Sequence, residues 1–472
     1  MSYDPSDRKF DPRLNRRKIL QIGAVGLGSL LTGDLARAGD SVAVASAPPT
    51  SRRLKVAAVF TQMHNRSHAH IIFENFLQKY PFNGKLIDSG MDIVSMYADQ
   101  FRPTDLTREV SDEYNIPIYK TIGDALRLGG KDLAVDAVLA IGEHGRYPRG
   151  REWLVEYPRK RFFDECVAVM RQSGRVVPYF NDKHLSYRWD WAREMYDTAR
   201  QLGMPLMAGS SVPFSQRIPP LEIPAGAEIS EALMIHGGEF ENYGIHAMET
   251  LQSIVEFRKG GETGISKVEV LYGEEMWKGA EAGRWPFELA AAAMQLELGK
   301  PYQMRMDLHD PIRWNPQPPH VLMITYKDGL KGYVLKIGHF PMRWQFACRL
   351  KGESQIRATR FYSGPWQNRN FFKALCHGIQ HFFRTGQSPV PAERVLLANG
   401  AILAGVDAYF QRGKPLATPY LEFGYQPRDF RPFREMGASW KTLITEGMPE
   451  PDGISAMPSR TMLRTKKERV EH

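Results

Sequence analysis

Polar side chains follow an apolar run near residue 60 of the chain. Leu54–Phe60 has the pattern of a buried strand, and the residues from Ser67 onward have the pattern of a helix. A helix that starts directly after a strand attracts anions, because its first backbone N–H groups are unpaired. Glycines usually let the backbone approach a phosphate at this point, but this stretch has none. The residues that would line such an anion site are Thr61, Gln62, His64, Asn65, Arg66 and Ser67.

Three interpretations of this loop remain open. It binds a dinucleotide in an altered pose, it binds another ligand, or it is structural and binds nothing. Phe60 and Gln62 are larger than the glycines that allow a tight turn and close contact with a pyrophosphate. Asn65 is the mildest replacement, because asparagine tolerates a positive φ.

Charged residues end two later apolar runs. Asp99 follows Met91–Ala98, where an acidic side chain accepts hydrogen bonds from the ribose of a bound adenosine, which favours NAD over NADP. Glu143 and His144 follow Val135–Ile141, a run typical of a strand that is buried on both faces. Because ligands bind at the carboxyl ends of parallel strands, we expect these residues to contribute to a cofactor site; the alternative is a solvated loop.

The first half of the chain predicts a scaffold that brings such strand ends together. From Leu54 to about Gly209, apolar runs of strand length alternate with amphipathic helical segments. The predicted strands are Leu54–Phe60, Met91–Ala98, Ile116–Lys120, Val135–Ile141, Val176–Phe180 and Pro205–Ala208. The predicted helices are Ser67–Lys79, Leu106–Tyr114, Ile122–Leu128, Phe162–Gly174 and Trp189–Leu202. This alternation indicates an α/β fold that begins with a Rossmann-like, doubly wound parallel sheet.

The second half has a different pattern. Strand-like runs there are Glu228–Gly237, Ile265–Gly273, His320–Tyr326 and Gly332–Ile337, and Asp328-Gly329 has the composition of a hairpin turn. Helices are predicted over Phe371–Arg384 and Ala392–Arg412. This half is predicted to be a second α/β domain with an open, mostly antiparallel sheet. We divide the chain into 1–38, a signal peptide; 39–53, a linker; 54–209, a dinucleotide-binding domain; 210–447, a substrate and oligomerisation domain; and 448–472, a polar tail.

The N-terminus predicts export. Arg16 and Arg17 form a twin-arginine pattern, an apolar run too short to cross a bilayer follows, and Ala36-Arg37-Ala38 resembles a cleavage site. The alternative is a disordered basic tail. A twin-arginine signal is read by the twin-arginine export machinery, which carries folded proteins, so we expect a periplasmic or otherwise exported protein without a stable membrane span.

Composition excludes other classes. The chain has 472 residues, enough for two domains, with 43% hydrophobic and 24% charged residues. Its net charge of +9 is spread along the chain, which argues against nucleic-acid binding. Cys166, Cys348 and Cys376 show no metal-type spacing, and we expect them to be buried core residues.

In order and spacing, four motifs resemble those of the Gfo/Idh/MocA oxidoreductase family. They are VAAVFTQMHNRSHA (Val56–Ala69) at the glycine loop, VDAVLAIGEH (Val135–His144), NDKHLS (Asn181–Ser186) in place of Glu-Lys-Pro, and NYGIHAMETL (Asn242–Leu251) in place of Asp-x-Gly-x-His. The resemblance covers about Leu54 to Thr418, most of the mature chain.

This resemblance implies roles for individual residues. Lys183 would polarise or help deprotonate a substrate hydroxyl, and His246 would be the general acid or base. Asp182 and Asn242, which replace the family's acidic residues, would position them. The implied reaction is hydride transfer at a secondary hydroxyl of a sugar, glycoside or cyclitol, with a tightly held NAD or NADP. In an exported protein this chemistry suits a redox-neutral overall reaction. The resemblance also implies a homo-oligomer.

The alternative is a derivative of this fold that has lost its cofactor. It would be a metal-dependent lyase or hydrolase, or a carbohydrate-binding protein. The possible metal ligands are His64, Glu143, His144, Asp182, His184, Glu239, Glu241 and His246, although no local spacing supports a metal site. The tryptophans that would stack on sugar rings are Trp189, Trp191, Trp277, Trp285, Trp314 and Trp344, although aromatic residues are more often part of a core.

Overall fold

The computed structural model describes most of the chain after Ser51. The described residues are 52–150, 154–299, 317–338, 343–362, 364–444, 448–451 and 453–454. The predicted signal peptide, nearly all of the linker and most of the polar tail lie outside them. No helix in this part of the chain has the length and apolar character needed to cross a membrane.

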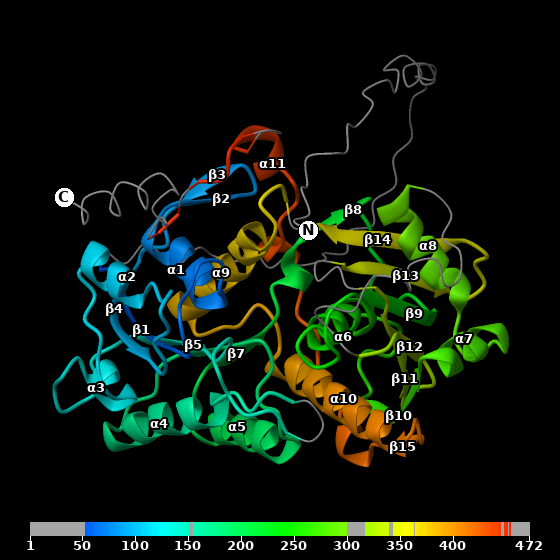
Figure 1. Ribbon diagram of the computed structural model, residues 1–472, viewed down its shortest axis with the longest axis horizontal. Helices are drawn as coiled ribbons and strands as arrows, with labels where there is room; N and C mark the ends of the chain where they lie inside the picture. Colours follow the sequence, from blue (N-terminus) through cyan, green and yellow to red (C-terminus); the bar gives the residue numbers. More distant parts are fainter. Residues whose placement is uncertain are drawn as a thin grey trace, which may run out of the picture. The chain divides into compact units, whose positions relative to one another are not determined.

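The first sheet has five parallel strands in the order β4-β1-β5-β6-β7 (Figure 1). They are β1 (Leu54–Phe60), β4 (Met91–Ala98), β5 (Ala137–Ile141), β6 (Tyr179–Asp182) and β7 (Leu206–Gly209). The central strands β1 and β5 are apolar and buried on both faces, as a parallel sheet covered by helices requires. The predicted doubly wound α/β sheet is confirmed.

Helices cover both faces of this sheet. Figure 1 shows α3, α4 and α5 along one face and α1 along the other. The bounds are α1 (His68–Leu77), α2 (Thr107–Tyr114), α3 (Ile122–Arg127), α4 (Arg159–Gln172) and α5 (Trp189–Gln201), with a hairpin of β2 (Tyr80–Phe82) and β3 (Lys85–Ile87) after α1. The strand predicted at Ile116–Lys120 is only one bridge, between Met96 and Ile118. Pro117 lies inside that run and has no N–H to donate to a ladder.

The second sheet has eight strands in the order β15-β10-β11-β12-β9-β13-β14-β8. They are β8 (Gln216–Ile218), β9 (Ile229–His236), β10 (Ile265–Tyr272), β11 (His320–Tyr326), β12 (Lys331–Lys336), β13 (Gln345–Leu350), β14 (Ile356–Tyr362) and β15 (Leu416–Ala417). Only the β9–β12 pair is parallel among these described strands, so the mostly antiparallel sheet is confirmed. The turn predicted at Asp328-Gly329 joins β11 to β12.

Helices also cover both faces of the second sheet. On one face lie α6 (Gly244–Val255) and α10 (Ala392–Phe410), and on the other lies α8 (Phe287–Leu298), with α7 (Glu274–Glu281) packed on β10. The last long helix, α9 (Asn368–Thr385), packs on α1, beside the first sheet. One continuous core therefore contains residues of both sheets, and it positions α6 against the strand ends of the first sheet.

Candidate active site

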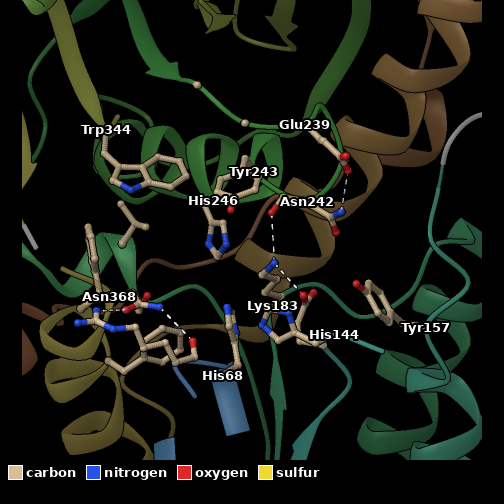
Figure 2. Close-up of a pocket in the computed structure, with 18 of the residues that line it drawn as sticks. His68, His144, Tyr157, Lys183, Glu239, Asn242, Tyr243, His246, Trp344 and Asn368 are labelled. Atoms are coloured by element: carbon tan, nitrogen blue, oxygen red, sulfur yellow. Dashed lines mark hydrogen bonds and ion pairs between the residues drawn. The ribbon is translucent and has the colours of Figure 1, made fainter. Parts of the chain in front are cut away.

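A cavity of about 550 Å³ lies where the carboxyl ends of β5 and β6 meet the start of α6 (Figure 2). This volume suits a small-molecule ligand. Five of the predicted site residues line it: Glu143, His144, Lys183, Asn242 and His246. Arg66 of the predicted anion loop also lines it, whereas the other predicted residues do not: Thr61, Gln62, His64, Asn65, Ser67, Asp99 and Asp182. The cavity thus gathers the residues expected at the reacting end of a cofactor and only Arg66 of those expected at its phosphate end.

Lys183 belongs to a buried network of charges. Its Nζ lies 3.0 Å from Oε2 of Glu143, whose Oε1 accepts a hydrogen bond of 2.5 Å from Arg159. Burial by itself would raise the pKa of Glu143, but Lys183 and Arg159 outweigh it and hold the pKa well below its usual value. The carboxylate of Glu143 is therefore ionised, and it anchors Lys183 at the cavity wall.

The loop that carries Lys183 is held by polar contacts where the related motif has a proline. Nε2 of His184 lies 2.6 Å from Glu241 and 3.2 Å from Arg159. The side-chain oxygen of Asn399, on α10, accepts hydrogen bonds from the next two backbone N–H groups of the loop. Lys183 itself has a φ of 60°, a strained conformation for a residue with a side chain. The surrounding contacts hold this conformation and direct the lysine to the cavity.

His246 has a different partner from the one expected. Its Nδ1 lies 2.5 Å from Oγ of Ser210, whereas the side chain of Asn242 donates to Glu239. Burial, and then the nearby Lys183 and His68, lower the pKa of His246 well below its usual value, so the ring is neutral near pH 7. The sequence analysis did not identify Ser210. It directly follows β7, so the rule that ligands bind at the carboxyl ends of parallel strands, which identified Glu143, could have found it.

His68 and Asp182 form a pair at the bottom of the cavity. Nδ1 of His68 lies 2.6 Å from Oδ2 of Asp182, and the carboxyl group is almost completely buried. His68 is the first residue of α1, and Asp182 is the last residue of β6. Asp182 was expected to position Lys183, but the structure places it against His68. The sequence marked His68 only as part of the altered loop.

The loop after β1 already has partners within the protein. The hydroxyl of Thr61 donates to the carbonyl of Glu143, and Met63 N donates to Oδ2 of Asp105 over 3.2 Å. The N–H of His64 donates to Oγ of Ser67 over 3.1 Å. A phosphate bound at this loop would therefore compete with the carboxylate of Asp105 for the backbone N–H of Met63.

Two further residues that could hold a dinucleotide, Arg66 and Asp99, also have partners within the protein. Arg66 forms an ion pair with Glu450, from the end of the chain. Asp99 accepts hydrogen bonds of 2.7 Å from Tyr97 and from Tyr147, and it pairs with Arg161. Burial would raise the pKa of Asp99, but these three donors outweigh it and lower the pKa. The residues at the phosphate and adenosine end thus have partners within the protein, whereas the cavity at the reacting end has room for a ligand.

Three buried polar atoms that belong to cavity-lining residues have no partner among the described residues. They are Nε2 of His144, Oδ1 of Asn242 and Nε1 of Trp344. The ring of Trp344 stacks on Tyr243 with centroids 6.1 Å apart (Figure 2). Buried polar atoms need hydrogen-bond partners, and a ligand with several hydroxyl groups supplies both donors and acceptors.

Metal binding has no geometric support in the described part of the chain. No group of three or more histidine, cysteine, aspartate or glutamate side chains there is arranged to hold a metal ion. The rings of His64 and His68 instead lie edge-on to His144, with centroids 5.0 and 5.4 Å away.

Comparisons with known proteins support the fold alone. No family model matches the sequence, and no curated protein matches it. Among solved structures, GenD2 from gentamicin A biosynthesis, in complex with NAD, is 11% identical; the match covers 82% of this chain and 99% of that one, with a TM-score of 0.51. The apo scyllo-inositol dehydrogenase from Lactobacillus casei is 11% identical, with coverage of 78% and 99% and a TM-score of 0.49. Such neighbours are dehydrogenases of the Gfo/Idh/MocA type, and GenD2 establishes the shared α/β fold.

Proposed function

We propose that this chain, which shares the fold of Gfo/Idh/MocA dehydrogenases, is an oxidoreductase-type enzyme that acts at a secondary hydroxyl of a sugar, glycoside or cyclitol. The observation that carries the proposal is that Lys183 and His246 meet in one cavity beside the unpartnered polar atoms described above. Residues 1–38 lead us to propose export to the periplasm, and the family resemblance leads us to propose a homo-oligomer.

The cavity wall offers a polyol both polar and apolar contacts. Nε1 of Trp344 donates a hydrogen bond, and Oδ1 of Asn242 accepts one. The stacked rings of Trp344 and Tyr243 provide an aromatic surface for the C–H groups of a sugar. These uncharged groups suit the hydroxyl and C–H groups of a sugar ring, and Arg66, Arg149 and Lys183 add positive charge elsewhere on the wall.

Lys183 and His246 act on the reacting hydroxyl. The ammonium group of Lys183, anchored by Glu143, stabilises negative charge as it develops on the substrate oxygen. His246, a neutral ring held by Ser210, hydrogen-bonds the same hydroxyl and orients it. This stabilisation serves a redox reaction and a redox-neutral one alike, because both pass through an oxyanion.

A nicotinamide, when bound, would supply the hydride acceptor, and Glu143 and His144 would border its ring at the end of β5. The carboxylates of Asp105 and Glu450 at the phosphate end favour a second candidate function. In that case the same residues catalyse a lyase-type or other redox-neutral reaction of a sugar without a dinucleotide.

Mass spectrometry of small molecules released from natively purified mature protein separates the two candidates. NAD or NADP in near-stoichiometric amount, together with turnover on a panel of sugars and cyclitols, supports the dehydrogenase. Calorimetric titration with both dinucleotides is the control for cofactor lost during purification. Absence of release and of binding, with turnover or sugar binding retained, supports the redox-neutral enzyme. Absence of any sugar binding overturns both.

A further inference from the structure

We infer that His68, held by Asp182, is the proton acceptor of this cavity and therefore a catalytic residue. This inference deepens the proposed function and rests on it. It assigns the one role that the anchored Lys183 and the neutral His246 leave open, namely the group that holds the proton taken from the substrate.

The geometry sets the tautomer of His68. A carboxylate only accepts hydrogen bonds, so at 2.6 Å from Asp182 the Nδ1 of His68 must carry the proton. Nε2 is then the basic nitrogen of the ring, and His68 lines the cavity. Because Asp182 is almost completely buried, water screens the pair little, and the carboxylate stabilises an imidazolium that forms on His68.

The other histidines of the cavity wall lack such support. His144 and His246 are the remaining histidines that line the cavity, and neither ring has a carboxylate hydrogen-bonded to it among the described residues. Burial and the neighbouring His68 lower the pKa of His144 to about 3, which makes it a poor proton acceptor near neutral pH. A ring supported only by Ser210, as in His246, gains no comparable stabilisation when it is charged.

Several parts of the fold place titratable side chains around the ring of His68. Lys183 and Glu143 follow β6 and β5 and form an ion pair, and Arg159 of α4 binds the same carboxylate. His144 and His64 are neutral neighbours at the strand ends, and His246 faces the ring from α6, with centroids 6.5 Å apart. From α9 only the apolar Phe372 touches the ring, edge-on at 4.7 Å. Asp182 is therefore the charged side chain that is hydrogen-bonded to the His68 ring.

The proton transfer balances within the cavity. The substrate O–H bond breaks, its proton binds Nε2 of His68, and the electron pair stays on the substrate oxygen. The ammonium of Lys183 offsets the negative charge of that oxygen, and Asp182 offsets the positive charge of the new imidazolium. In a redox-neutral reaction the reverse transfer returns the proton to the substrate oxygen, whereas in a net oxidation that oxygen becomes a carbonyl and His68 releases the proton to water.

The first test does not need a substrate. Protein labelled with ¹⁵N only at histidine should show a His68 Nδ1 proton shifted downfield by its bond to a carboxylate, with His68→Gln used to assign the signal. Asp182→Asn should move this proton upfield, whereas Ser210→Ala should leave it in place and perturb His246 instead. A His68 ring protonated at Nε2 and not at Nδ1 would overturn the inference.

The second test uses whichever sugar wild-type protein turns over. His68→Gln should lower kcat about 100-fold or more with little change in KM, the usual size of a lost proton transfer. His68→Ala should recover part of its rate when imidazole is added. A kcat of His68→Gln close to wild type contradicts the inference while the proposed function stands. If wild-type protein neither binds nor turns over any sugar, the proposed function fails, and the catalytic role of His68 fails with it.

Discussion

At the scale of single residues, we propose that the cavity assigns charge stabilisation to Lys183 and proton transfer to His68. Lys183 has a buried counter-charge in Glu143, which would hold it as a fixed positive charge beside the substrate. Its position depends on a left-handed backbone that the side chain of Asn399 and the ring of His184 hold in place. Such strain is maintained only where many contacts oppose its release.

Replacement of this charge should therefore impair catalysis. Lys183→Met retains the length of the side chain and removes the ammonium, so we expect kcat on the identified sugar to fall about 100-fold or more. Steady-state kinetics of purified protein measures the change. Lys351→Met, at an exposed lysine, is the matched control and should keep wild-type kcat. An unchanged kcat in Lys183→Met would remove Lys183 from the mechanism.

At the scale of elements, a buried acidic side chain helps to join α6 to the first sheet. Glu249 of α6 accepts a hydrogen bond of 2.8 Å from the N–H of Ser210, directly after β7. Burial raises the pKa of Glu249 to about 8, although Arg394 partly opposes this. Protonated Glu249 thus helps to fix the segment that carries Ser210, the partner of His246.

This raised pKa predicts a pH-dependent stability. A carboxyl group whose pKa is higher in the folded than in the unfolded state stabilises most at low pH and loses that contribution as pH rises through the folded value. The free energy of unfolding of wild-type protein, minus that of Glu249→Gln, should fall between about pH 5 and about pH 8. The slope is at most about 1.4 kcal/mol per pH unit.

Urea unfolding at several pH values measures this difference. A difference between wild type and Glu249→Gln that is constant with pH would mean that Glu249 is ionised in the folded protein.

At the scale of the whole molecule, segments from the C-terminal part of the chain contact α1, the helix that carries His68. Arg369 of α9 makes hydrogen bonds of 2.9 and 2.7 Å to Glu74 of α1, and it also pairs with Glu450 near the end of the chain. His70 contacts the carbonyl of Ile454. The helix that starts with His68 is thus held by segments about 300 residues or more away in sequence.

Removal of this connection should destabilise the fold. Arg369→Met leaves the buried carboxylate of Glu74 without its main partner, so we expect a loss of about 3 kcal/mol in the free energy of unfolding. Arg431→Met breaks an exposed pair with Asp429 and should cost less than about 1 kcal/mol. Equal effects in the two variants, measured by denaturant unfolding, would show that the α1–α9 contact carries little of the stability.

The face of the second sheet opposite α6 and α10 is one surface through which a homo-oligomer could form. Apolar residues of that face pack against α7 and α8 in a cluster that includes Trp277, Trp285 and Leu289. These two helices cover the surface that an open sheet would offer to a second copy. A homo-oligomer of this chain would use a different surface from the bare sheet.

The fold class was readable from the sequence because it depends on local patterns. Continuous apolar runs such as Val135–Ile141 indicate strands buried on both faces, and their alternation with amphipathic helices leaves few topologies. The strands β13 and β14 were not predicted, because Gln345–Leu350 and Ile356–Tyr362 carry several polar residues and β14 is only half-buried. Their place in the sheet comes from pairing with β9 and with each other, which no local pattern shows.

The sequence by itself determined which residues stand at the carboxyl ends of strands, so it could place Glu143, His144 and Lys183 near one another. Only the tertiary structure decided their partners. His68 meets Asp182 across 114 residues, and His246 meets Ser210 rather than Asn242. Strand ends follow from hydrophobic periodicity, whereas a hydrogen bond depends on side-chain positions to within about 0.5 Å, and those are set by how α1 and α6 pack on the two sheets.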